Sequence, residues 1–175
     1  MAVNRSVLGI DLGTSNTSAA WMDARARLSV VQVQGVDNLM PSVVWQGADG
    51  RVLVGQDARQ KMIEDPANTI YGLKRFLGRL FRSEFVGRHR DVLPFKLVED
   101  EEGLCGVELH GKVRRLQDLA SDLLRHIVGL ANIQAGAAFT DAVLTVPAHY
   151  GYRQRQAMRA AAQTVGLNVR ALVNE

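Results

Sequence analysis

Apolar residues in the first third of the chain come in short runs separated by turn-forming residues, a pattern that predicts strands rather than helices. The first three runs follow one another closely, so we expect them to form a meander. Two further short strands are expected on either side of an Asp-Gly turn. The strands expected from this pattern are Val7–Gly9, Ser18–Met22, Leu28–Val33, Ser42–Gln46 and Val52–Val54.

The last third of the chain shows helical spacing instead. Over Leu116–Ala135, leucine and isoleucine recur every three or four residues, which places them on one face of a helix, and Gly136 is a suitable stop. A second amphipathic helix is expected over Gln154–Val165. Continuous apolar runs at Ala142–Val146 and Val169–Val173 predict buried strands beside these helices.

The middle of the chain predicts a smaller α/β unit. Short helices are expected over Gln56–Ile63 and Leu73–Leu80, the second with a basic outer face. Phe95–Val98 and Leu104–His110 alternate well enough for a hairpin. The acidic residues 99–102 fall in its turn, and we expect a solvated loop there rather than a metal site.

The order of elements is therefore a β-meander, a smaller α/β insertion, and then helix, strand, helix, strand. This order suits an α/β protein with a ribonuclease-H-like core and an inserted subdomain. We expect residues 1–38 and 116–175 to form the core and residues 39–115 to form the insertion.

The amino-acid composition and charge limit the classes of binding partner that we expect for this chain. A length of 175 residues suits one domain or two small lobes, and 47% hydrophobic residues is ordinary for a globular protein. The net charge of +3 favours no particular partner. The basic stretch from Lys74 to Arg90 lacks interleaved aromatic residues, so we expect a solvated face and no nucleic-acid partner. The longest apolar stretch, Ile127–Phe139, is too short to span a bilayer, so no membrane partner is expected.

The single cysteine, Cys105, excludes an internal disulfide, and a reducing cytoplasm is the simplest setting. The N-terminus shows no apolar signal segment, which favours the same compartment. The four histidines show no metal-ligand spacing.

The most informative candidate chemistry lies between the first two expected strands. Asp11 ends an apolar run, and Gly13, Thr14, Ser15 and Asn16 follow within five residues. We expect a tight turn in which the glycine and the asparagine take unusual backbone angles. Its N–H groups and hydroxyls would form a cradle for phosphate oxygens, with a hydrated Mg²⁺ between the acid and the phosphate. An ordinary surface hairpin is the alternative that the local pattern leaves open.

The octet Ile10–Thr17 resembles the first phosphate loop of the actin, hexokinase and Hsp70 superfamily of ATPases. Six further segments resemble the Hsp70 family in particular, and they follow its order along nearly the whole chain. The most specific has the family's Asn-Thr-x-x-x-x-Lys-Arg-x-x-Gly-Arg signature, at residues 68–79. The six segments are Asn38–Val44, Val54–Ala58, Asn68–Arg79, Ala142–Ala148, Arg155–Ala157 and Leu172–Glu175.

The resemblance implies an actin-like ATPase that binds ATP or ADP with Mg²⁺, and it also admits K⁺. It implies that Asp11 meets the metal through water and that the loop after it cradles the phosphates. Lys74 would lie near the terminal phosphate, although by pattern alone it is a solvated helix lysine. Glu175 would face the metal and the attacking water, although by pattern alone it is an ordinary acid.

The family also pairs a proline with a downstream arginine as a relay between nucleotide and substrate domain, here Pro147 and Arg155. Between them the chain departs from the family, which usually has two aromatic residues and then Asn-Asp after Pro-Ala. This chain has the sequence 149–153, His-Tyr-Gly-Tyr-Arg, so the coupling to a partner is the part of the resemblance most affected.

Taken together, the resemblance implies the first lobe of an Hsp70-like molecular chaperone active in the stress response. Its parent would couple ATP hydrolysis to binding and release of unfolded polypeptide and would work with co-chaperones. The family's second phosphate loop, adenosine pocket and peptide-binding domain lie beyond this sequence. We therefore expect one lobe only, not catalytic by itself, with a core face left exposed for self-association.

Two other functions stay open. One is a small-molecule kinase of the same superfamily, which the segment at residues 68–79 disfavours. The other is a non-catalytic nucleotide-binding or regulatory module.

Overall fold

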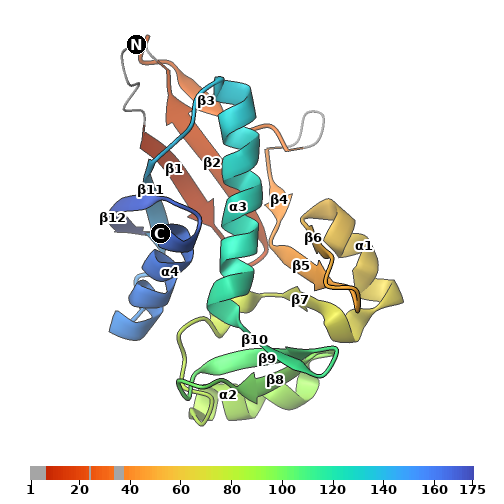
Figure 1. Ribbon diagram of the computed structural model, residues 1–175. Coiled ribbons are helices and arrows are strands. Elements are labelled where there is room, and N and C mark those ends of the chain that lie inside the picture. Colours follow the sequence, from red (N-terminus) through yellow and green to blue (C-terminus); the bar gives the residue numbers. More distant parts are fainter. Residues whose placement is uncertain (1–6, 24, 34–37) are drawn as a thin grey trace.

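The computed structural model describes residues 7–23, 25–33 and 38–175, and these form a mixed α/β structure (Figure 1). The largest sheet has six strands in the order β12-β11-β1-β2-β3, with β4 paired to β2. β1, β2 and β3 form an antiparallel meander, whereas β11 and β12 run parallel to β1. The strands are β1 (Val7–Leu12), β2 (Asn16–Met22), β3 (Leu28–Val30), β4 (Met40–Pro41), β11 (Asp141–Val146) and β12 (Asn168–Asn174).

The alternation of β1 decides which side chains enter the core. Leu8, Ile10 and Leu12 are buried, while Asp11 lies among the exposed positions of the same strand. Since successive side chains of a strand point to opposite faces, the acid at the end of β1 is held away from the core.

Two helices, α3 (Leu116–Ala135) and α4 (Tyr152–Thr164), contact each other and contribute to the same core as β1. Their contact includes a hydrogen bond of 3.1 Å from the Ser121 hydroxyl to the Ala161 carbonyl. α3 packs across β2 and reaches down to the smaller sheets (Figure 1). It ends at Gly136, which has a φ of 62°, as the sequence predicts.

The middle of the chain forms two three-stranded antiparallel sheets, ordered β6-β5-β7 and β10-β9-β8. The first contains β5 (Val43–Gln46), β6 (Val52–Val54) and β7 (Thr69–Tyr71), and the second contains β8 (Lys96–Glu99), β9 (Cys105–Leu109) and β10 (Lys112–Arg115). The helical segments of this part are α1 (Gln56–Glu64), α2 (Glu84–His89) and the 3-10 turns η1 (Pro66–Asn68), η2 (Leu73–Arg75) and η3 (Arg90–Val92).

A polar network joins the two small sheets to α3. The Arg114 guanidinium on β10 donates to the side chain of Gln46 on β5 and, over 3.1 Å, to Asp122 on α3. His110 contacts the Gln46 carbonyl at 2.9 Å. These contacts fix the small sheets to the helix that also covers the large sheet.

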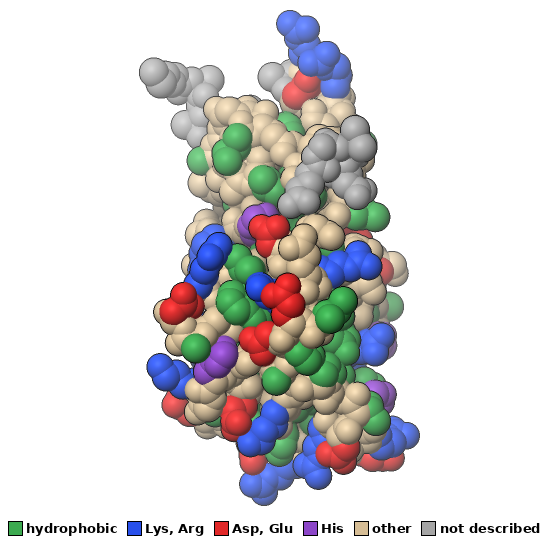
Figure 2. Space-filling model, turned by 90° about the vertical axis from the view of Figure 1, so that its right-hand side faces the viewer, with side chains coloured by type: hydrophobic (Ala, Val, Ile, Leu, Met, Phe, Trp, Pro, Cys, Tyr) green, Lys and Arg blue, Asp and Glu red, His purple; other side chains and the backbone are tan. Residues whose placement is uncertain are grey.

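Charged side chains of both signs are mixed on the face shown in Figure 2. Along the basic stretch, Arg82, Arg88 and Arg90 pair with neighbouring acids at 3.1, 3.6 and 3.5 Å. This pairing is typical of a solvated, mixed-charge face. Within the described residues, no helix combines the length and the apolar character needed to cross a membrane.

The expected elements are confirmed where their pattern is long or strongly apolar, as in α3, α4, β11 and β12. The helix expected over Leu73–Leu80 is wrong, since only the short turn η2 forms there. Gly72 and Gly78, with φ values of 62° and 67°, take left-handed conformations on either side of η2 and stop a helix.

Three strands and one α-helix have no counterpart in the expectations, namely β4, β7, β10 and α2. Each is short, and β10 carries a single apolar residue, Val113. The turn that leads into β10 does have a signal: His110 and Gly111 both have positive φ, 49° and 75°, as a tight hairpin requires.

We expect Gly78→Ala to lower the free energy of unfolding by about 3 kcal/mol, the sum of a left-handed backbone and an overpacked contact. A Cβ on Gly78 would lie 2.8 Å from both the Arg153 carbonyl oxygen and the Gln154 Cα, at the start of α4. Gly136→Ala is the matched control, because its φ is equally left-handed but a Cβ there meets nothing within 4 Å. Urea unfolding measures both, and equal losses would contradict the close approach at Gly78.

Candidate functional site

Three neighbouring strands of the large sheet end at one edge and bring polar side chains together there. β1 carries Asp11, β11 carries Thr145, and β12 leads into Glu175. Thr145 Oγ1 lies 2.6 Å from Asp11 Oδ1 and 3.4 Å from Glu175 Oε1. Because parallel strands present their carboxyl ends at the same edge, residues more than a hundred positions apart meet in one cluster.

Lys74 reaches this cluster from the turn η2. Its Nζ forms an ion pair with Glu175 Oε1, and its side chain is 1% exposed, against 41% for the Glu175 side chain. The solvated helix lysine that the local pattern predicts is therefore wrong: the ammonium is buried and faces a carboxylate.

The charges of the cluster favour a hydrated cation. The one ammonium of Lys74 offsets only one of the two carboxylates, Asp11 and Glu175, so one negative charge is left over, and Thr145 adds a hydroxyl. Oxygen donors of this kind suit Mg²⁺, which keeps several of its waters. In the described part of the chain, no group of three or more His, Cys, Asp or Glu residues could enclose a metal directly.

The turn between β1 and β2 is shaped by steric fit. The Gly13 N–H donates to the Asn16 carbonyl over 3.0 Å, and a Cβ on Gly13 would lie 2.3 Å from that oxygen. Neither residue has a positive φ, so the unusual angles expected of them are wrong. Glycine is required because a side chain would collide with the turn, not because of its φ.

The turn is held against the strand region that follows β4. The Ser42 N–H donates to the Ser15 carbonyl over 2.8 Å, and the hydroxyls of Thr17 and Ser42 lie 2.9 Å apart. Asn16 also pairs with Pro41 of β4. The loop residues thus have a fixed position relative to the sheet edge.

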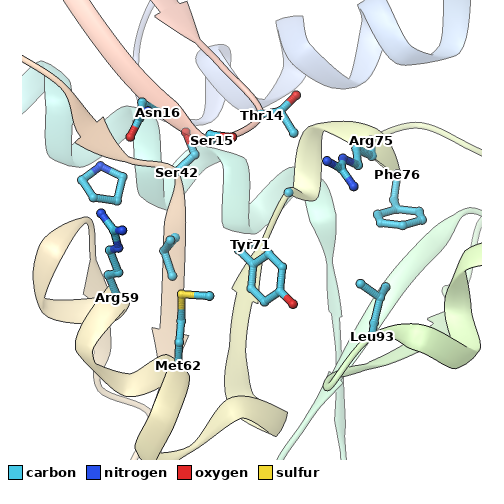
Figure 3. A pocket seen from close by; sticks show the side chains of 13 residues that line it. Thr14, Ser15, Asn16, Ser42, Arg59, Met62, Tyr71, Arg75, Phe76 and Leu93 are labelled. Carbon is cyan, nitrogen blue, oxygen red and sulfur yellow. The ribbon is translucent and has the colours of Figure 1, made fainter.

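A pocket of about 280 Å³ opens beside this loop (Figure 3). Arg59 and Arg75 lie on opposite sides of it, and Thr14 and Ser15 form its rim near the loop. Two guanidinium groups and hydroxyls around one space favour an anionic group. The remaining lining residues are Asn16, Pro41, Ser42, Val43, Met62, Tyr71, Gly72, Phe76 and Leu93.

The other two residues singled out from the sequence also lie at this edge of the sheet. Pro147 directly follows β11, and its carbonyl accepts the Tyr150 N–H over 3.0 Å. Arg155, on α4, donates from Nη2 to Asn174 Oδ1 over 2.8 Å. Asn174 directly precedes Glu175 in the chain, so Arg155 contacts the residue next to one member of the cluster.

Sequence reasoning missed two residues of this region, Thr145 and Tyr150. Thr145 is the one polar residue of the apolar run Ala142–Val146, which was the available signal, and its hydroxyl contacts Asp11. Tyr150 is 5% exposed, and its hydroxyl donates to the Lys74 carbonyl. Burial, together with the charge of Glu175, raises the pKa of the Tyr150 phenol, so it stays a donor at neutral pH.

One comparison with known protein families bears on this geometry. The sequence model of a family described as "Hsp70 protein" matches residues 7–175. The match includes the loop after β1, the turn η2 and the strands β11 and β12 that form the edge.

The unequal exposure of Lys74 and Glu175 predicts unequal losses of stability. Glu175→Ala should lower the free energy of unfolding by about 3 kcal/mol, because it leaves a buried ammonium without its carboxylate. Lys74→Met should change it by less than about 1 kcal/mol, because water can hydrate the half-exposed carboxylate that remains. Urea unfolding of the C-terminal amide, which keeps the main-chain carboxylate from replacing the side chain, measures both. A larger loss for Lys74→Met would contradict the assignment.

Proposed function

The chain belongs to the Hsp70 family, and we propose that it forms the first lobe of an Hsp70-like chaperone ATPase. The observation that carries the proposal is the meeting of Asp11, Thr145, Lys74 and Glu175 at one sheet edge, beside a loop fixed by Gly13. In this function the lobe supplies one side of a MgATP site. The complete ATPase couples hydrolysis to the binding and release of unfolded polypeptide.

We propose that the large sheet with α3 and α4 is a ribonuclease-H-like core of the actin-like ATPase kind. A three-stranded antiparallel meander followed by two parallel strands supports this assignment. Residues 39–115 would be the inserted subdomain, because they contain both small sheets. The boundary near residue 38 adjoins residues 34–37, which lie outside the described residues, as do residues 1–6 and 24 of the proposed core.

The chemistry of phosphoryl transfer assigns a role to each side chain. Mg²⁺, when bound, neutralises phosphate charge. Asp11 would hold the waters of that ion, and Thr145 keeps the carboxylate oriented by donating to Oδ1. Lys74 would turn its ammonium toward the terminal phosphate, and Glu175 would orient the attacking water.

The loop completes the phosphate side of the site. Thr14, Ser15 and Asn16 would cradle phosphate oxygens with hydroxyl, amide and backbone donors, as their place at the pocket rim supports. K⁺ is a second cation that the same oxygen-rich edge would admit.

We also assign Pro147 and Arg155 to a relay toward the polypeptide-binding part and co-chaperones. The contact from Arg155 to Asn174, next to Glu175, supports this role. We propose that the complete ATPase is located in the cytoplasm and takes part in the stress response. Cys105, whose pKa burial raises to about 12, fits a reducing compartment in which thiols stay free.

Isothermal titration of this chain with MgATP should detect only weak binding, with a dissociation constant above about 0.1 mM, because the lobe supplies one side of the site. Asp11→Asn should weaken that binding at least about tenfold, as loss of a group that holds a metal's waters does. Shifts of the Gly13–Asn16 amide resonances follow binding that is too weak for calorimetry.

Glu101→Gln is the matched control, because it removes one negative charge from an exposed turn of the inserted part. It should leave nucleotide binding unchanged. Nucleotide binding that is equal in the Asp11→Asn chain and the unsubstituted chain would contradict the role of Asp11. Steady phosphate release from the chain alone, lost in Asp11→Asn, would contradict the one-sided site.

We also propose that the chain self-associates through the edge strand β12 of the large sheet. β12 lies at the edge of the large sheet, and Val173 on it is 49% exposed. We expect light scattering to show dimers that increase with concentration, and Val173→Lys to reduce them, because a charge on an edge strand opposes pairing. Ile63→Lys is the control, since Ile63 is 91% exposed on α1 rather than on this edge. A monomer at all concentrations would contradict the proposal.

A further inference from the structure

A closed ring of contacts joins Lys74 to the segment that follows β11. The Tyr150 hydroxyl donates to the Lys74 carbonyl, and Arg155 Nε donates to the Tyr150 carbonyl over 3.0 Å. Arg155 Nη2 donates to Asn174 Oδ1 over 2.8 Å. Glu175 follows Asn174 and closes the ring through its ion pair with Lys74.

We propose that Tyr150 is a positioning residue for Lys74. Its hydroxyl fixes the backbone of η2 to the segment Pro147–Arg155, so that the lysine side chain starts from one place and meets Glu175. The inference deepens the proposed function and rests on it in one respect, namely that Lys74 serves the phosphate site.

The backbone of η2 supports this role. The N–H groups of Phe76 and Leu77 both donate to the Leu73 carbonyl, each over 3.0 Å, and the Lys74 carbonyl receives the Tyr150 hydroxyl. A buried carbonyl at the end of a short helical turn needs such a partner, because water cannot replace it. Tyr150 and Lys74 are 5% and 2% exposed, so water is excluded from this contact.

The nature of the lysine side chain explains why positioning matters. An ammonium on a flexible four-carbon stem is a point charge with many rotamers, so its place depends on the backbone that carries it. Lys74 is buried beside one carboxylate, and a small shift of η2 would move the ammonium out of contact. Two tethers, one at the backbone carbonyl and one at the ammonium, fix both ends of the residue.

A double-mutant cycle tests the proposal without nucleotide. Four chains are unfolded with urea as C-terminal amides: the unsubstituted chain, Lys74→Met, Glu175→Ala and the double variant. The same four chains are then measured with Tyr150→Phe added to each. The coupling between the two positions should be about a hundredfold in the unfolding equilibrium constant with Tyr150, and less than about tenfold with phenylalanine. Tyr150→Phe deletes only the hydroxyl.

The coupling, rather than stability, is the decisive quantity. If Tyr150 were merely structural, its replacement would lower the stability of all four members of the cycle equally and leave the coupling unchanged. Tyr152→Phe is the matched control, because Tyr152 is 77% exposed and its hydroxyl contacts Gln156 on the same helix. It should keep the coupling at its full value. Equal coupling with Tyr150 and with phenylalanine would overturn the proposal.

If the Tyr150→Phe chain does not fold, Arg155→Lys is a second variant that removes contacts of the same ring. Arg155 is half-buried, and lysine cannot donate to the Tyr150 carbonyl and Asn174 with the same fork. A reduced coupling between Lys74 and Glu175 supports the ring, and an unchanged one overturns it. Nucleotide binding that Asp11→Asn leaves unchanged would count against the proposed function alone, since the cycle contains no nucleotide.

Discussion

The burial of one ammonium group constrains the whole edge of the large sheet. Lys74 is almost fully covered, and an isolated charge in such a place is unfavourable by several kcal/mol in typical proteins. Glu175 relieves this, but only if β12 lies beside β11 in its observed register. The parallel pairing of β11 with β1, on its other side, places Thr145 against Asp11. The ion pair therefore links the position of η2 to the order of the strands.

That dependence explains which features the sequence could predict. The helices α3 and α4 and the strands β11 and β12 follow from periodicity because each buries its own continuous apolar face. The loop after Asp11 could be found because glycine, hydroxyl residues and an acid are adjacent in sequence. Lys74 could not be placed in this way: its partner is 101 residues away, and local periodicity contains no information about that contact.

The predictions of local structure that were wrong at glycines failed for two different physical reasons. At Gly72 and Gly78 a basic, partly apolar stretch predicts a helix, but left-handed backbone on both sides allows only η2. At Gly13 the requirement is space, since the Asn16 carbonyl occupies the place of a side chain. The sequence shows a glycine in all three cases, and only the three-dimensional contacts distinguish a conformational from a steric need.

The exposure of the charged side chains also determines which of them an incoming ligand contacts first. Asp11 and Glu175 face outward, whereas the compensating ammonium of Lys74 lies behind them. A bare phosphate that approaches these two carboxylates would be repelled, because the ammonium of Lys74 lies behind them. A phosphate that carries Mg²⁺ presents a positive ion to those carboxylates and brings its oxygens near Lys74 afterwards. The arrangement thus favours the metal complex of an anion over the free anion, because the acids are in front and the base is behind.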